Sequence, residues 1–469
     1  MVYRCSLSDE KNKKDSSECQ ICKYCDEYNT IPAWISEVHG LGKIISKQCV
    51  LKKWLWISVL FFCICGSFLT IFDIIKKYKE GETSTFTSVK IVPSLDLPAL
   101  TICPDVEDIL FVDGIYKEVQ SFRSNITMNE VKDLIHYFLA GNGYNYMNRI
   151  KYFTRNYVDY IEKLYIQWSK NYTTFDFFFH IQEKYGINCK EFFVQCYYQR
   201  KIVDCCKKIF NVIPVLGRGL CFQTIKGLKQ EDEDDIGKLI LKIKVPNYTN
   251  ANKLNEKNLK LIIFVKSDFG IITATHPIYI FPHIYNTLLV KARRIELIDK
   301  NANCLMEIEG NNNICTLKNW LKSKLIYPFN CTFSYLRYIS QDNKFPICDL
   351  STIVNFYFDN SNHFKLFYKS KTKCTPGCFR WQYFTTLQTG NVLTKFPDYH
   401  FNLRMSFMSI QYQQITESYT TSIPAFIAQI GGQFGFFLGI SVITIFQILI
   451  YLYKKILMLF SGINPTKNN

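Results

Sequence analysis

The sequence predicts an α+β membrane protein in which two transmembrane helices flank a large, disulfide-rich extracellular domain. Three observations predict this fold class. Long apolar runs lie near both ends of the 469-residue chain, an even set of cysteines lies between them, and this middle segment has the mixed pattern of a globular domain. Both chain ends therefore belong on one side of a membrane.

The first apolar run covers 54–72 and contains no charged residue, and charged residues follow it directly. Roughly 20 apolar residues cross a bilayer, so the run predicts a transmembrane helix over 54–75, after a cytosolic segment, 1–53. A cleaved signal peptide is disfavoured, because the run begins too far from Met1 and lacks a small-residue cleavage site.

The second apolar run is uncharged from Ser418 to Tyr453 and is rich in small residues. It predicts a transmembrane segment over 423–453, followed by a cytosolic segment, 454–469. Small residues let helices pack closely or let backbone carbonyls face a water-filled path, so both a helix contact and a pore are open readings. The small residues are Gly431, Gly432, Gly435, Gly439 and Ser441.

Flanking charge and sequons orient the chain. Lys454 and Lys455 follow the second run, whereas Arg404 is the only Lys or Arg in 396–423, which predicts a cytosolic C-terminus and an extracellular segment, 76–422. The sequons between the runs predict glycosylation on the same side, at Asn125, Asn171, Asn247 and Asn330.

Cysteines in the middle segment predict up to six disulfides of an oxidising compartment. Paired C-x2-C units and His at ligand spacing are lacking, so neither a metal site nor a cofactor is predicted. Cys19, Cys22 and Cys25 lack a fourth ligand and receive no role. The middle set is Cys103, Cys189, Cys196, Cys205, Cys206, Cys221, Cys304, Cys315, Cys331, Cys348, Cys374 and Cys378.

Composition argues against two functional classes. The net charge is +16, but the basic residues are spread along a chain with two membrane runs, which argues against nucleic-acid binding. The chain has no Gly-x-Ser-x-Gly elbow, phosphate-binding loop or His-Glu-x-x-His helix, so we predict that it is not an enzyme.

Periodicity in the middle segment is mixed. Alternation over 239–245 predicts a strand and 260–265 predicts another, whereas 131–138 has helical spacing and ends at glycines. Residues 190–210 also read as a helix. Helices and strands do not alternate as in a parallel α/β sheet, so we expect helices segregated from an antiparallel core.

Short motifs in a fixed order give the chain a resemblance to the degenerin, epithelial sodium channel and acid-sensing ion channel family over nearly its whole length. They are Ser36-Glu37-Val38-His39-Gly40 followed by Ile44 ahead of the first span, Leu97-Pro98-Ala99-Leu100-Thr101-Ile102-Cys103 after it, Gly219-Leu220-Cys221-Phe222, Cys374-Thr375-Pro376-Gly377-Cys378, and Ile410-Gln411-Tyr412-Gln413-Gln414-Ile415 before the second span.

The resemblance implies a trimeric, amiloride-sensitive cation channel of the plasma membrane, formed as a homo- or heterotrimer with related subunits. Each subunit would contribute two membrane helices and an extracellular domain of palm, knuckle, finger, thumb and β-ball. Closed symmetry would turn one short motif per chain into a ring around the pore. Sodium is the expected permeant ion, with calcium as a second candidate.

The resemblance places the selectivity filter at Gly439, Ile440 and Ser441. Ile440 is bulky where the family has a small residue. Gln447 stands where the family has a glutamate, which removes a ring of charge at the inner mouth. We therefore predict weaker or altered cation selectivity.

Gating residues follow from the same resemblance. Ala428 stands at the degenerin position, where a larger side chain props the pore open, and Gln429 replaces an acidic residue of proton-gated members. Gly431 and Gly432 complete the predicted gate. His39 and Gly40 correspond to residues that support gating from the cytosolic side.

The family pattern also implies disulfide pairs. It joins Cys103 to Cys221 and Cys331 to Cys348, and it links Cys304 and Cys315 to Cys374 and Cys378 in a nested ladder. The remaining four cysteines would pair among themselves in an order that the sequence leaves open: Cys189, Cys196, Cys205 and Cys206.

The stimulus has three candidates in such a family: protons, neuropeptides and mechanical or constitutive drive. The acidic run 231–235 reads as a solvated loop, with calcium or a basic peptide as its alternative ligands. With Gln429, this favours a peptide ligand, as in the invertebrate (hydrozoan-like) RFamide-gated branch. An accessory, non-conducting subunit and a cell-surface binding protein remain alternatives.

Overall fold

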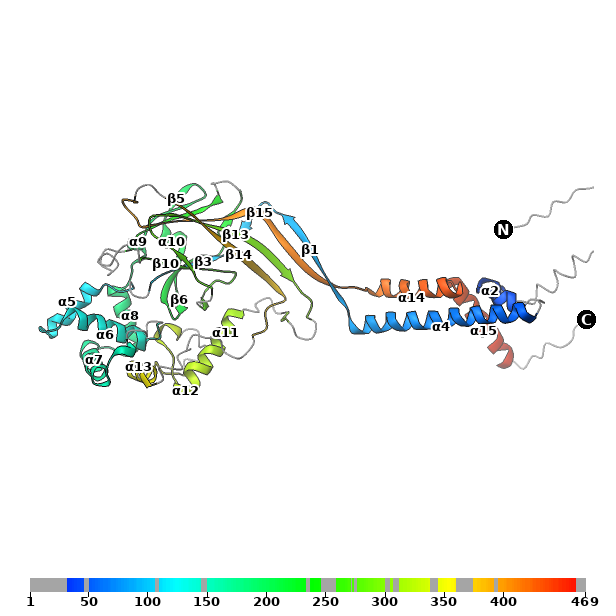
Figure 1. Ribbon diagram of the computed structural model, residues 1–469, viewed down its shortest axis with the longest axis horizontal. Helices are drawn as coiled ribbons and strands as arrows, with labels where there is room; N and C mark the ends of the chain where they lie inside the picture. The colour runs from blue at the N-terminus through cyan, green and yellow to red at the C-terminus, as the bar shows by residue number, and fades with distance from the viewer. Residues whose placement is uncertain are drawn as a thin grey trace, which may run out of the picture. The chain divides into compact units, whose positions relative to one another are not determined.

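The chain divides into two compact units, here called the terminal unit and the central unit (Figure 1). The terminal unit combines Met1–Ser84 with Tyr419–Asn469, and the central unit is Thr85–Ser418. The computed structural model describes residues 32–45, 50–105, 109–144, 150–232, 237–245, 259–270, 272–273, 276–299, 304–306, 312–337, 345–359, 374–391 and 395–460.

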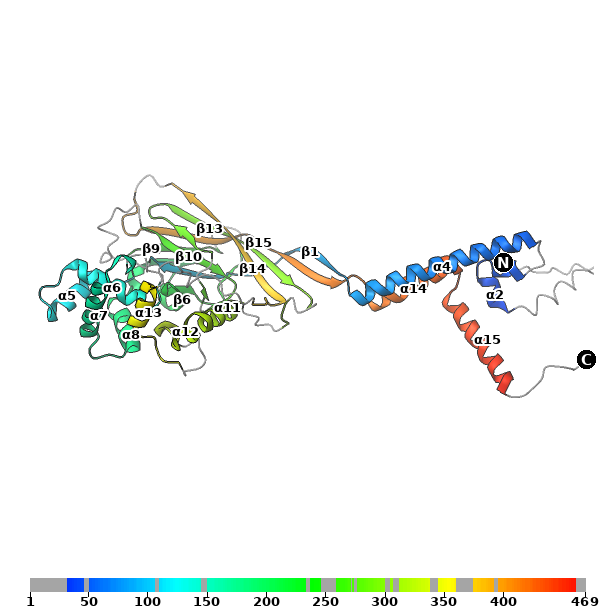
Figure 2. The same cartoon turned by 60° about the horizontal axis from the view of Figure 1, so that its bottom comes forward.

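The terminal unit is helical throughout its described elements. Within these residues, α4 alone is long and apolar enough to cross a membrane by itself, and α14 and α15 pass the same test only as a pair bent by 79°. The predicted segment 423–453 is therefore two helices with a sharp bend, which Figure 2 shows where α15 leaves α14. The helices are α2 (Ala33–Glu37), α3 (Leu41–Ile45), α4 (Val50–Glu80), α14 (Ile423–Leu438) and α15 (Val442–Phe460).

Helices α4 and α14 lie side by side in both views (Figures 1 and 2). Tyr78 and Phe426 stack with ring centroids 4.2 Å apart. Further along, a Cβ added to Gly66 would lie 3.0 Å from the ring of Phe437, so a glycine at this position permits the close approach.

The larger sheet of the central unit has the strand order β14-β13-β15-β9-β4-β5 in its described residues, and β1 also pairs with β15. Strand β9 confirms the prediction for 239–245, with buried and half-buried residues in alternation. The strands are β1 (Thr83–Ile91), β4 (Phe193–Tyr198), β5 (Lys201–Val203), β9 (Leu239–Ile243), β13 (Tyr285–Glu296), β14 (Phe379–Gly390) and β15 (Phe401–Tyr419).

A second sheet has the described order β11-β6-β7-β3-β10-β12, and β2 pairs separately with β8. Strand β10 confirms the strand predicted at 260–265. The strands are β2 (Leu95–Asp96), β3 (Ala99–Pro104), β6 (Phe210–Leu216), β7 (Gly219–Thr224), β8 (Lys229–Gln230), β10 (Leu261–Lys266), β11 (Ile272–Thr273) and β12 (Ile278–Ile280).

The expectation of an antiparallel core is right for most strand pairs and wrong for two. Strand β13 pairs with β14 in antiparallel and with β15 in parallel orientation, and β11 runs parallel to β6. Strand β13 lies between β14 and β15. Because β14 and β15 run in opposite directions, β13 can be antiparallel to only one of them, and it is parallel to the other.

Helices of the central unit gather beside the sheets (Figure 1) and have their own apolar core, distinct from the cluster between the sheets. The helix predicted at 131–138 is α6, and Thr127 and Glu130 form a capping box at its start. These elements are α5 (Val112–Phe122), α6 (Met128–Gly141), η2 (Ile150–Tyr152), α7 (Arg155–Trp168), α8 (Thr174–Tyr185), α11 (Asn312–Leu321), η6 (Lys322–Ile326), α12 (Tyr327–Phe329), η7 (Ser334–Leu336) and α13 (Leu350–Asp359).

The helix predicted over 190–210 is wrong. The segment contains two short helices, α9 (Cys189–Phe192) and α10 (Cys205–Lys208), around the hairpin of β4 and β5. Gln199 and Arg200 both have positive φ, as a two-residue hairpin turn of type I′ requires. Strand β4 also pairs with β9, and this distant partner overrides the local spacing.

Candidate functional site

The most distinctive site of the terminal unit is the break between α14 and α15. Gly439 caps the end of α14 with φ +70, a left-handed conformation that favours glycine. Its N–H donates to the Gly435 carbonyl at 3.0 Å, and the Ile440 N–H donates to the Phe434 carbonyl at 3.3 Å. The helix therefore ends cleanly within the apolar run.

Ser441 starts the next helix. The Thr444 N–H donates to Ser441 Oγ and the Ser441 N–H donates to Thr444 Oγ1, each at 3.2 Å, and the two hydroxyl oxygens lie 2.9 Å apart. This reciprocal pairing satisfies polar groups at a helix start inside an apolar segment. The predicted filter residues Gly439, Ile440 and Ser441 thus form the whole bend.

His39 and Gly40 lie against this bend, 400 positions away in sequence. The His39 N–H donates to the Leu438 carbonyl at 2.9 Å, and a Cβ added to Gly439 would lie 2.7 Å from the His39 ring. Gly40 has φ +80, and an added Cβ there would lie 3.2 Å from Trp56. The structure therefore unites two motifs that sequence reasoning treated separately.

Glu37 is a site residue that sequence reasoning missed. Its Oε2 accepts from Thr444 Oγ1 at 2.5 Å and its Oε1 accepts from Gln447 Nε2 at 3.2 Å. Trp34, on the same helix α2, also lies close to α15, with its ring centroid 6.2 Å from that of Tyr451. One signal was available, since Glu37 is the only acidic residue in 28–72.

The predicted gate residues share an exposed face of α14. Ala428, Gln429, Gly431 and Gly432 are all exposed in the single chain, whereas Phe426 packs on α4. A Cβ added to Gly431 or Gly432 would meet no atom within 4 Å. Small residues on an open helix face suit either a close helix neighbour or a water-filled path.

Comparison with known proteins identifies the family. The family model for amiloride-sensitive sodium channels matches residues 35–451, which include the His-Gly segment, the central unit and the bend. The chain belongs to the amiloride-sensitive sodium channel family. The members of this family are ion channels embedded in membranes.

Two individual proteins show weaker similarity. Acid-sensing ion channel 1C of Danio rerio is 26% identical over 178 residues, a match that covers 36% of this chain and 30% of that protein. The chain thus spans less than a third of this relative's length. A cryo-EM structure of a proton-activated chloride channel covers 85% of this chain and 95% of its own, at 7% identity and a TM-score of 0.30, too low to support an argument.

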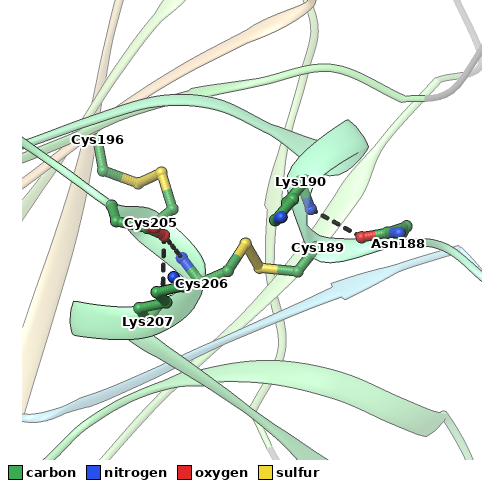
Figure 3. The surroundings of a disulfide bond; sticks show 8 residues. Asn188, Cys189, Lys190, Cys196, Cys205, Cys206 and Lys207 are labelled. Carbon is green, nitrogen blue, oxygen red and sulfur yellow. Dashed lines mark hydrogen bonds between the residues drawn. A yellow bond between two sulfur atoms is a disulfide. The ribbon is translucent and has the colours of Figure 1, made fainter.

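The central unit of this family member is clamped by six disulfides among its described residues. Figure 3 shows two of them, which join α10 to β4 and to α9. Beside these disulfides, the side chain of Asp204 accepts a hydrogen bond from the Cys206 N–H, and the side chain of Asn188 accepts one from the Lys190 N–H. The pairs agree with those that the resemblance implied and supply the order that the sequence left open. They are Cys103–Cys221, Cys189–Cys206, Cys196–Cys205, Cys304–Cys378, Cys315–Cys374 and Cys331–Cys348.

The predicted glycosylation sites are accessible where the structure describes them. Asn125, Asn171 and Asn330 are exposed, and Asn247 lies outside the described residues. In the acidic run, Glu231 and Asp232 are exposed, which agrees with a solvated loop, and the other three positions lie outside the described part.

Glu118 is a polar junction inside the helical cluster. Lys184 Nζ and Trp168 Nε1 donate to it at 2.7 Å and 2.9 Å, and the Tyr185 hydroxyl donates to it as well. Burial alone would raise the pKa of the Glu118 carboxyl, but these hydrogen bonds and the charge of Lys184 outweigh burial and lower the pKa.

Glu130 shows the same balance. Burial acts to raise the pKa of its carboxyl, and hydrogen bonds from Thr127 and Tyr160 lower it overall. Both carboxylates are therefore held ionised at neutral pH. A proton sensor requires the opposite shift.

Proposed function

We propose that this chain is a subunit of an amiloride-sensitive, sodium-permeable cation channel in the plasma membrane. In this proposal the chain crosses the membrane over 54–75 and 423–453, both ends are cytosolic, and 76–422 is an extracellular domain of palm, knuckle, finger, thumb and β-ball. Family membership supports conduction, and the sequons and the lysines after the second run support the orientation.

The observation that carries the proposal is the bend at Gly439 next to the exposed small residues of α14. Non-helical backbone at membrane depth is tolerated where it lines a water-filled cavity or is buried in protein. Three copies around an axis would bring both features into a ring. We assign the filter to Gly439, Ile440 and Ser441.

The proposed gate is the exposed face of Ala428, Gln429, Gly431 and Gly432. A larger side chain at Ala428 would crowd this face in a closed trimer and favour the open state. The side chains of Ile440 and Gln447 should make the sodium preference weaker than that of a filter with a small middle residue and an acidic inner ring.

An extracellular neuropeptide is the stimulus that we favour. Glu118 and Glu130 have lowered pKa values, so neither of these two carboxylates is suited to sense protons near neutral pH. The central unit also has a cavity of about 810 Å³, where Asp96 and Asp268 lie with Arg380, Trp381 and Tyr412. Lys226 lines the same cavity, so its acidic and basic side chains are balanced, and with the aromatic rings they would suit a peptide that carries both polar and apolar groups.

The test is two-electrode recording from cells that express the chain alone with Ala428→Val, in sodium, then in potassium, then with amiloride. The mutation bypasses the unidentified ligand. We expect a constitutive, amiloride-sensitive cation current. The unmodified chain without ligand is the matched control and should stay closed.

A second candidate is an accessory subunit that conducts only in a heterotrimer. Ile440 and Gln447 favour it, because both depart from the pore pattern of the family. Silence of Ala428→Val, with surface delivery verified by biotinylation, would reject the homomeric channel. Current on coexpression with a related subunit would then establish the accessory role.

A further inference from the structure

We propose that Glu37 supplies the carboxylate of the cytosolic pore mouth, at the level where α15 itself carries the neutral Gln447. The inference rests on the proposed channel function and extends it to a residue outside the second membrane segment. In this proposal the Glu37 carboxylate, which comes from α2, raises the local concentration of cations at the inner mouth of the pore.

The geometry fixes the position of this carboxylate. Glu37 ends α2, and its two oxygens accept from Thr444 and Gln447 at 2.5 Å and 3.2 Å. Ser441 directly precedes α15, and Thr444 and Gln447 follow it at three-residue spacing, so the three residues lie along one side of the helix. The carboxylate thus lies on the helix face that begins at the proposed filter.

Its negative charge is not neutralised by these contacts. The donors are a hydroxyl and an amide, so they orient the carboxylate without compensating its charge. Thr444 is fully buried and Glu37 is half-buried, so the group is held in place beside the bend. A fixed charge in a partly desolvated mouth acts more strongly on a passing ion than one in bulk water.

Among the described residues of the terminal unit, Glu37 is the only acidic residue ahead of Asp73, and none follows Tyr419. The sequence has no acidic residue from Ser418 to Asn469 and only Glu37 in 28–72. Among the described residues, the next acid along the chain is Asp73, which lies about 35 Å along α4 from Val50 at 1.5 Å per residue. The described charged residues that follow Glu37 through the first turn of α4, and those within α15, are basic: Lys43, Lys52, Lys53, Lys454 and Lys455.

A cation path with this set of lysines would repel cations at its inner end unless a carboxylate faced it. In a closed trimer the three copies of Glu37 would form a ring of carboxylates at one level of this path, which would attract cations against the field of the lysines. The carboxylate is therefore a determinant of conductance from the cytosolic side.

The experiment is single-channel recording from inside-out patches of the Ala428→Val chain at low and high salt. Glu37→Gln should lower outward conductance roughly two- to tenfold at low salt, with inward rectification, and the loss should shrink at high salt. The double variant Glu37→Gln with Gln447→Glu moves the charge onto α15 and should restore outward conductance.

Glu80→Gln is the matched control, because it removes an exposed carboxylate at the opposite end of α4. It should leave outward conductance unchanged. Unaltered conductance in Glu37→Gln at low salt, or a double variant that stays as low as the single one, would overturn the inference while the channel function stands.

A second variant separates charge from folding. Glu37→Cys treated from the cytosolic side with an anionic thiol reagent should regain outward conductance, and a cationic reagent should lower it further, relative to the treated Ala428→Val parent. If Ala428→Val is silent, the homomeric channel function fails on its own. The placement of Glu37 is then tested by oxidative crosslinking in a double variant, Glu37→Cys with Gln447→Cys. If peptide maps show no disulfide between these two positions, the placement is overturned.

Discussion

The two units of the molecule bury opposite kinds of side chain. In the central unit the fully buried residues are mainly large and apolar, as with Phe138 and Phe401. In the described part of the terminal unit, the residues that reach the same burial are polar, Ser67 and Thr444, while apolar side chains such as Phe436 are exposed.

This inversion shows what stabilises each unit. Burial of apolar surface away from water drives the folding of the central unit, and disulfides constrain it further. Lipid tails are as apolar as leucine, so membrane helices instead associate through close packing and polar contacts. The same substitution should therefore act differently in the two units.

A phenylalanine truncation in each unit tests this contrast with the largest expected effect. The ring of Phe138 is fully buried among Tyr165, Trp168, Phe177 and Phe178. Phe138→Ala should lower the free energy of unfolding by about 3–5 kcal/mol, because it loses buried area and leaves a cavity. Thermal unfolding of the detergent-purified chain measures the loss.

Phe436→Ala is the matched control, since this ring is 78% exposed in the single chain. Its unfolding temperature should stay near that of the parent. Equal destabilisation by both truncations would contradict the contrast and place Phe436 in a tight contact between copies of the chain.

The bend provides the next test, through a glycine whose backbone and surroundings both exclude a side chain. Gly439→Ala would force φ +70 on alanine, a cost of about 1–2 kcal/mol, and would place its Cβ against the His39 ring. In the Ala428→Val chain it should abolish current with surface delivery intact. Recording together with biotinylation checks this.

Gly432→Ala is the control for folding at the bend, because its new methyl meets open space on a helical backbone. It should preserve surface delivery and the unfolding temperature. Normal current in Gly439→Ala would show that the bend does not form part of the conduction path.

Local pattern was enough to predict much of the fold. Strand β9 alternates because one of its faces is buried, and the apolar positions that predicted α6 are all buried in the structure. The segment 190–210 failed because its hairpin depends on pairing with β9, which no local window contains. The caps of α6 were readable, since Thr127 and Glu130 have capping-box spacing.

The site was predictable only in pieces. Gly439 and His39 were each found by resemblance, but their contact joins residues 400 positions apart. Glu37 lies within the segment that resembles the His-Gly motif, but no role was predicted for it, and its partner Thr444 is 407 positions away. A buried polar contact between distant segments leaves no period in a sequence, so the structure was needed to find it.

The smallest expected change in stability concerns Glu118 in the central unit, whose carboxylate accepts several hydrogen bonds. Its side chain is 24% exposed, and its pKa is lowered by hydrogen bonds that outweigh burial. A lowered folded-state pKa gives stability that is present above the unfolded value near 4.5 and is lost as pH falls through the folded value.

Glu118→Gln should therefore lower the free energy of unfolding by about 1 kcal/mol at pH 7, and the difference from the parent should shrink as the pH falls below the unfolded value. Thermal unfolding across pH measures this. Glu183→Gln removes an exposed carboxylate next to Lys184 and should change little at any pH. A pH-independent loss in Glu118→Gln would mean that its packing, not its charge, stabilises the cluster, and the central unit would then depend on apolar burial even at its most polar junction.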